Sequence, residues 1–123
     1  MPKVVAVIGA SADRRKFGNR AVRAFQAKGY TVVPINPNER EIEGLKTYKS
    51  VLDVPGSIDM ATVYVQPEIG LQVIADVAQK GIGEVWLNPG ADDEAVIARA
   101  RALHLKPIVA CSIVGIGQNP YDF

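Results

Sequence analysis

Short apolar runs alternate along this chain with longer segments in which apolar residues recur every three or four positions. The short runs are rich in β-branched residues, which is typical of the buried strands of a parallel sheet. The longer segments have the single apolar face of an amphipathic helix. The pattern predicts five strands, at Val4–Ile8, Tyr30–Ile35, Ala61–Val65, Glu84–Leu87 and Ile108–Ala110.

Three helices are predicted between these strands. The first covers Arg20–Lys28, and Gly29 is a suitable residue to end it. The second starts at Pro67, a residue type favoured at the first helical position, and ends near Gly81. The third begins at the acidic residues 92–94, because negative charge stabilises a helix N-terminus.

Two segments have less regular patterns. Residues 39–55 carry one local signal, a short helix capped by Ser50. Residues 115–123 show no period and are expected to form a tail. Trp86 lies within a predicted strand, so we expect its ring to pack in the core.

The order of these elements predicts an α/β fold. Strands joined by helical crossovers form a parallel sheet with helices on both faces. The expected architecture is therefore a three-layer, Rossmann-like, doubly wound parallel sheet of five strands, in one domain covering residues 1–123. Such folds bind ligands at the carboxyl ends of their strands. The residues that follow the first four strands are the candidate site, and they are 9–11, 36–38, 65–67 and 87–90.

The composition narrows the class of protein. Hydrophobic residues make up 48% and charged residues 22% of the chain, as in soluble globular proteins, and the net charge of +1 gives no reason to expect nucleic acid or membrane as a partner. The single cysteine, Cys111, allows no internal disulfide and suits a reducing compartment. No signal-peptide pattern precedes Val4, so a cytoplasmic protein is expected.

The loop after the first strand has the features of a phosphate site. Gly9, Ala10 and Ser11 are small, so a phosphate group can approach the backbone there, and the following helix directs its N–H groups at it. Two plainer interpretations stay open, an ordinary turn and a solvated basic loop. Arg20 and Arg23 are expected on the exposed helix face. Five cations occur within ten residues, namely Arg14, Arg15, Lys16, Arg20 and Arg23.

The details of the loop argue against NAD as the ligand. The dinucleotide motif needs two further glycines soon after Gly9, and here the next is Gly18. NAD sites usually place a carboxylate at the end of the second strand, where this chain has Asn36 followed by Pro37. A neutral residue near cations tolerates a phosphate on the ribose. NADP and coenzyme A therefore fit this position better than NAD.

Several motifs, taken together, carry a family resemblance over about residues 4–111. With them the chain resembles the small bacterial and archaeal CoA-binding proteins, whose domain is similar to the N-terminal CoA-binding domain of the succinyl-CoA synthetase α subunit. The motifs are Val7-Ile8-Gly9-Ala10-Ser11, Lys16-Phe17-Gly18, Gly29-Tyr30, Val33-Pro34-Ile35-Asn36-Pro37, Ile42-x-Gly44, Tyr48-x-Ser50, Pro55-x-x-Ile58-Asp59 and Val85-Trp86-Leu87-Asn88-Pro89-Gly90-Ala91.

The resemblance implies coenzyme A as the ligand and assigns it a set of contacts. It implies that the Gly9–Ser11 loop faces the phosphates, and that basic residues such as Arg15, Lys16 or Arg40 meet them. The remaining contacts that it implies lie at the strand ends, at Asn36, Pro37 and Asn38 for the nucleotide and at Val65, Gln66, Pro67, Leu87, Asn88 and Pro89 along the rest of the ligand.

No combination of residues predicts catalysis or a metal site. His104 is the only histidine and is expected on the surface near a helix end, and Cys111 is expected to be a small buried residue, with a mixed disulfide to CoA as the alternative. The expected function is therefore non-catalytic binding of CoA or an acyl-CoA. Two alternatives stay open, an NADP-binding oxidoreductase or a fragment of one, and a protein-interaction scaffold without a nucleotide. A homodimer is compatible with the sequence.

Overall fold

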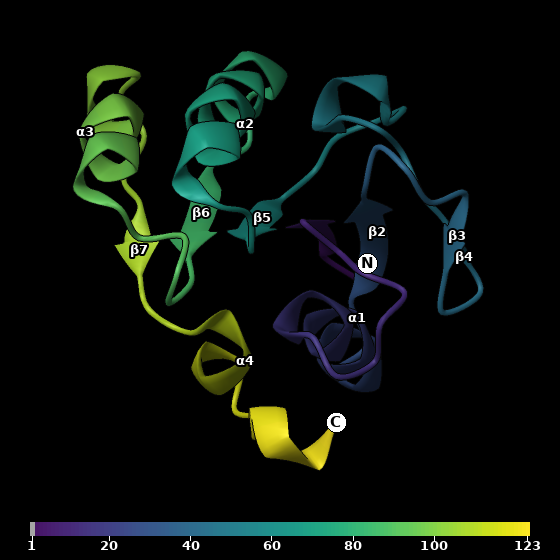
Figure 1. Ribbon diagram of the computed structural model, residues 1–123. Helices are drawn as coiled ribbons and strands as arrows, with labels where there is room; N and C mark the ends of the chain where they lie inside the picture. Colours follow the sequence, from purple (N-terminus) through teal and green to yellow (C-terminus); the bar gives the residue numbers. More distant parts are fainter. Residues whose placement is uncertain (1) are drawn as a thin grey trace.

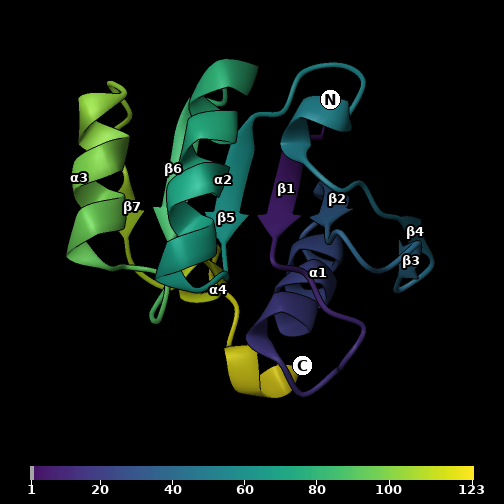
Figure 2. The ribbon, with the colours of Figure 1, turned by 45° about the horizontal axis from the view of Figure 1, so that its top comes forward.

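The computed structural model describes residues 2–123 and contains one five-stranded parallel sheet. Figure 2 shows the strands side by side, in the order β2-β1-β5-β6-β7. The predicted doubly wound, Rossmann-like α/β fold is confirmed. The strands are β1 (Val4–Ile8), β2 (Thr31–Ile35), β5 (Met60–Val63), β6 (Glu84–Leu87) and β7 (Ile108–Val109).

Helices cover both faces of the sheet. In Figure 1, α2 and α3 lie on one side of the strands, and α1 and α4 lie on the other. The three-layer arrangement is thus confirmed. The helices are α1 (Phe17–Ala27), α2 (Pro67–Lys80), α3 (Glu94–Ala102) and the short α4 (Ser112–Gly115).

Alternating side chains of β1 supply the two halves of the core. Val5 and Val7 pack in the cluster that holds the α1 side chain Phe25. Ala6 and Ile8 point to the opposite face and belong to the cluster that holds Ile74 of α2 and Val96 of α3. Because β1 is buried on both faces, it reads as a continuous apolar run rather than an alternating one.

Two element boundaries differ from the sequence prediction by two residues or more, one in α1 and one in β5. Helix α1 begins at Phe17 instead of Arg20, although Lys16 provides no side-chain cap and Gly18 is a poor helix former. Close packing of this first turn on the loop after β1 fixes the helix start instead. Strand β5 ends at Val63 rather than Val65, and the backbone N–H of Tyr64 makes one last bond to Ile8 O at 2.8 Å.

The segment 39–55 folds into a small hairpin and one helical turn. Strands β3 (Glu41–Ile42) and β4 (Leu45–Lys46) pair antiparallel around a turn in which Glu43 has a φ of 50°. No pattern in the sequence predicts these two-residue strands. The predicted capped turn is present as the 3-10 helix η1 (Val51–Asp53), where Ser50 Oγ accepts a hydrogen bond from Leu52 N at 3.1 Å.

The C-terminal segment packs on the protein, so the expectation of a tail is wrong. The 3-10 helix η2 (Pro120–Asp122) lies beside α1, as Figure 1 shows. There the guanidinium of Arg20 lies 5.1 Å from the ring centre of Phe17 and 5.9 Å from that of Tyr121. These contacts are favourable cation–π geometries. They half-bury Arg20, which was expected on an exposed face.

Candidate functional site

A cleft of about 660 Å³ opens at the carboxyl ends of the central strands. It lies between β1 and β5, where the strand order reverses: β2 pairs with one edge of β1, and β5 pairs with the other edge. This reversal is the usual ligand position in doubly wound folds, and the volume is in the usual range for ligand pockets. The lining residues are Ile8–Ser11, Lys16–Gly18, Ile35–Asn38, Lys49, Tyr64–Gln66, Ile69, Gln72, Val73, Asp76 and Pro89–Ala91.

Two glycines bring the loop after β1 into contact with its neighbours. Gly9 has a φ of 89°, and a Cβ there would lie 2.9 Å from the backbone carbonyl of Tyr64. Gly18, in the first turn of α1, faces the carbonyl of Gly9 so closely that a Cβ would clash with its oxygen. The absence of both side chains therefore lets the first turn of α1 sit directly against the loop.

The N-terminus of α1 carries no negative cap. Lys16 is its N-cap residue without a side-chain cap hydrogen bond, and its first turn holds no acidic residue. Helix α3 differs, because Asp93 Oδ1 accepts from Ala95 N at 2.9 Å and Glu94 follows. Since the first N–H groups of a helix lack partners within it, and Lys16, Phe17 and Gly18 line the cleft, this end of α1 favours an anion.

Two of the basic residues near the loop are paired within the protein. Arg15 donates from Nε and Nη2 to the carboxylate of Asp13 at 3.1 and 3.0 Å. These hydrogen bonds lower the pKa of Asp13 to about 2 and raise the pKa of Arg15. Arg14 forms an ion pair with Glu43 at 3.5 Å. Both cations therefore already have a carboxylate partner within the protein.

A third cation is turned inward. Arg23 donates from Nε to Asn19 Oδ1 at 2.7 Å and from Nη2 to Arg14 O at 2.8 Å, and burial lowers its pKa. It was expected on an exposed face, and it is half-buried instead. Lys16 lines the cleft, and no carboxylate in residues 2–123 lies within ion-pair distance of it.

The end of β2 is tied to the same loop. Asn36 donates from Nδ2 to Ala10 O at 2.8 Å, and its Oδ1 accepts from Asn38 N at 2.7 Å. Its amide therefore holds two backbone segments together, while the exposed Pro37 and Asn38 border the cleft beside it. Arg40 is exposed and lies outside the lining.

The ends of β5 and β6 contribute unequally to the cleft. Val65, Gln66 and Pro89 line it, whereas Pro67, the first residue of α2, does not. Leu87 and Asn88 are fully buried beneath it.

Asn88 belongs to a buried hydrogen-bond network under the cleft. Its Nδ2 donates to Thr62 Oγ1 at 2.7 Å and to Val63 O at 2.9 Å, and its Oδ1 accepts from Ser112 N at 2.8 Å. The hydroxyls of Thr62 and Ser112 lie 2.7 Å apart. The network joins β5, β6 and the start of α4.

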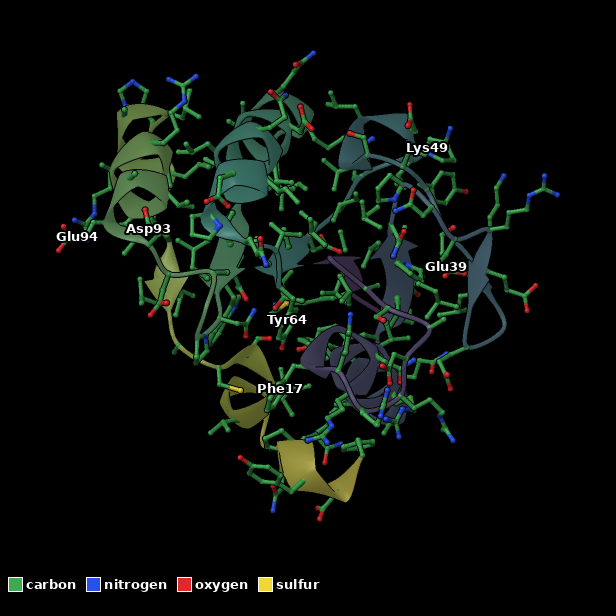
Figure 3. The ribbon with its side chains drawn as sticks, viewed as in Figure 1. Phe17, Glu39, Lys49, Tyr64, Asp93 and Glu94 are labelled. Atoms are coloured by element: carbon green, nitrogen blue, oxygen red, sulfur yellow. The ribbon has the colours of Figure 1, made fainter. Side chains whose placement is uncertain are left out.

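The sequence interpretation missed Tyr64, which lines the cleft between the loop and Val65. Its phenol oxygen lies 3.3 Å from Ser112 Oγ, and burial raises its pKa to about 12, so the phenol stays neutral at physiological pH. Figure 3 shows Tyr64 and Phe17 near the middle of the molecule and Lys49 beside η1. The position of Tyr64 directly after the buried part of a strand was the signal that could have identified it.

The single cysteine and the single histidine lie outside the cleft lining. Cys111 is half-buried before α4, packs against the core and does not line the cleft. His104 is exposed after α3, as predicted. Within the part of the chain that the structure describes, no three His, Cys, Asp or Glu residues are grouped to hold a metal, and no helix is long and apolar enough to cross a bilayer.

Comparison with known proteins finds one matching family and several related ligases. The sequence pattern of the family described as CoA binding domain matches residues 3–116. Acetate–CoA ligase [ADP-forming] II of Archaeoglobus fulgidus is 43% identical over 96 residues, which cover 76% of this chain and 14% of that protein. The α subunit of the Pyrococcus furiosus ligase II is 37% identical over 91 residues, or 72% of this chain and 20% of that subunit. The chain thus spans a fifth or less of these two curated relatives.

Solved structures share the fold over nearly the whole chain. A conserved hypothetical protein from Pyrococcus furiosus superposes with a TM-score of 0.83 at 32% identity, covering 94% of this chain and 99% of that one. A dinucleotide-forming acetyl-coenzyme A synthetase 1 from Ca. Korarchaeum cryptofilum superposes with a TM-score of 0.74 at 32% identity, covering 86% of this chain and 25% of that one.

Proposed function

The chain belongs to the CoA binding domain family, and from this premise we propose that it binds coenzyme A or an acyl-CoA in the cleft without catalysing a reaction. The phosphates lie at the loop Gly9–Ser11 and the start of α1. We further propose that residues 1–123 form a single domain that acts in the cytoplasm.

The observation that carries this proposal is the uncapped N-terminus of α1. Lys16, Phe17 and Gly18 line the cleft, Lys16 is the N-cap, and the first turn lacks an acidic residue. Exposed positive charge at this end of a helix is unfavourable by about 0.3–1 kcal/mol, and a bound phosphate reverses the sign of that interaction. Gly18 adds the close approach of helix and loop that a diphosphate needs.

The side chains divide into ligand contacts and supports. Lys16 is the principal cationic contact, and Pro37 and Asn38 border the nucleotide part. Val65, Gln66 and Pro89 border the rest of the ligand. The resemblance also implies four further contacts, and we propose that these residues support the backbone around the cleft instead of touching the ligand. They are Asn36, Pro67, Leu87 and Asn88. Arg15 contributes to phosphate binding only as far as its bonds to Asp13 allow, and Arg40 contributes at long range.

Catalysis is not part of this proposal. The curated relatives are named as ligases, and this chain aligns with 14% and 20% of their lengths. The cleft residues include no nucleophile paired with a base.

Isothermal titration of the apo protein with CoA, dephospho-CoA, NADP and NAD at low ionic strength tests the proposal. We expect a micromolar Kd for CoA and weaker binding of dephospho-CoA, because the ribose phosphate is lost. Tighter binding of NADP would favour an oxidoreductase, and binding of none of the four would favour a protein-interaction scaffold.

Two adjacent cations provide a matched pair of variants. Lys16→Gln removes an unpaired cation that lines the cleft beside the phosphate loop, and we expect the Kd for CoA to rise about fivefold or more. Arg15→Gln removes an equal charge that is already bound to Asp13, so its effect on the Kd is smaller. Equal effects of the two variants would show that long-range charge, rather than contact, governs binding.

A further inference from the structure

Asn19 is a fully buried polar residue that lies next to the cleft and does not line it. From the first turn of α1, its Nδ2 donates to Ser11 O at 2.8 Å and to Glu43 Oε2 at 3.1 Å. Its Oδ1 accepts from Arg23 Nε at 2.7 Å. One side chain therefore connects the phosphate loop, the helix and the β3–β4 hairpin.

The connection reaches the loop at a second point. Arg23, held by Asn19, donates from Nη2 to Arg14 O at 2.8 Å. The carbonyls of Ser11 and Arg14 both belong to the loop, and each accepts a hydrogen bond from a side chain anchored in α1. Because buried polar groups lose much when a partner is removed, these bonds fix the path of the loop between them.

Glu43 completes the arrangement from the hairpin turn. Its Oε2 accepts from Asn19, and its Oε1 pairs with Arg14 at 3.5 Å. The residue has a φ of 50°, a conformation that non-glycine residues adopt rarely. The hairpin thus supplies a carboxylate to the loop from a turn that is 24 residues away from Asn19 in sequence.

We infer that Asn19 and Glu43 are positioning residues for the anion site. The hydrogen bond between these two residues and the bonds of Asn19 to Ser11 O and Arg23 form a unit that we call the strut. The strut holds the loop after β1 in the shape that receives a phosphate. This inference rests on the proposed function for its ligand. It assigns the hairpin, which is outside the cleft lining, a role in affinity.

A charge-matched pair of variants tests the strut. Glu43→Gln and Glu43→Ala remove the same charge, but only glutamine keeps a carbonyl oxygen that accepts from Asn19. We expect Glu43→Ala to bind CoA about threefold or more weakly than Glu43→Gln. In an Asn19→Leu background, where the donor is absent, the two are expected to bind equally. Equal Kd values of the pair with Asn19 present would overturn the inference.

Amide hydrogen exchange of the loop, measured without ligand, separates this inference from the proposed function. Exchange over residues 10–16 is expected to be faster in Asn19→Leu and Glu43→Ala than in the parent protein. Val96→Ala, a core change in α3, provides a destabilised control whose loop exchange and Kd stay unchanged. If the parent protein does not bind CoA, the proposed function fails. Hydrogen exchange over residues 10–16 still tests whether the strut orders the loop. Unchanged loop exchange in Asn19→Leu overturns the strut, whatever the ligand.

Discussion

Replacing Gly18 by alanine tests the contact between α1 and the loop most directly. In the first turn of an exposed helix this change would normally stabilise the protein, by up to about 1 kcal/mol, because alanine is the better helix former. Here a Cβ would clash with Gly9 O and would lie 3.2 Å from Gly9 C and 3.3 Å from Ala10 Cα. All three are backbone atoms, so no side chain can rotate away.

The geometry also prevents the loop from yielding. Gly9 is itself packed against Tyr64, since a Cβ on Gly9 would lie 2.9 Å from the Tyr64 carbonyl carbon and oxygen. The start of α1 must therefore move away from the loop. Overpacking of this kind costs about 1–3 kcal/mol, which outweighs the gain in helix propensity. We expect Gly18→Ala to lower the free energy of unfolding by about 1–2 kcal/mol and to weaken CoA binding about tenfold.

Gly70→Ala in α2 is the matched control. Its Cβ would meet only side-chain atoms of Val96, at 3.2 and 3.7 Å, so the neighbour can adjust. Urea unfolding and calorimetric titration of both variants supply the comparison. We expect Gly70→Ala to have an unfolding free energy near or above that of the parent protein and an unchanged Kd. A Gly18→Ala protein that is as stable as the parent and binds CoA equally well would refute the reasoning.

Two further predictions concern the network under the cleft. The pKa of Tyr64 is raised from about 10 to about 12, so the unfolded state loses the phenol proton at a lower pH than the folded state. The free energy of unfolding is therefore expected to fall by about 2–3 kcal/mol as the pH rises from 10 to 12. The same unfolding titration of Tyr64→Phe should lack this fall, and an identical slope in both proteins would contradict the assignment. Asn88→Leu leaves Ser112 N without its acceptor and removes the amide that donates to Thr62 Oγ1, so we expect a loss of about 2–4 kcal/mol in the free energy of unfolding, measured by urea denaturation. A loss below about 0.5 kcal/mol would mean that water replaces the amide.

The sequence predicted those features that depend on local chemistry. Buried β-branched runs located the strands, Pro67 marked the first turn of α2, and Gly81 adopts the left-handed conformation that ends it. Gly9 and Ser11 were expected to border a ligand because they follow the first strand, and both line the cleft. Each of these signals lies within a few residues of the element that it specifies.

The missed features depend on contacts between distant segments. The bond from Asn19 to Glu43 needs a hairpin whose strands have two residues each, too short to show a period. The basic run suggested five available cations, yet Asp13 and Glu43 neutralise two of them and Asn19 turns a third inward. Counting charges along a sequence does not show which are already paired.

Backbone-to-backbone packing at the loop has a thermodynamic consequence. Gly9 and Gly18 place β1, the end of β5 and the start of α1 in contact without any intervening side chain, so few rotamers remain to be frozen there when a ligand arrives. Ordering a flexible side chain on binding costs about 0.5–1.5 kcal/mol, and this part of the site avoids most of that loss of conformational entropy. A phosphate bound here, as proposed, would therefore lose little affinity to the ordering of side chains in this part of the site.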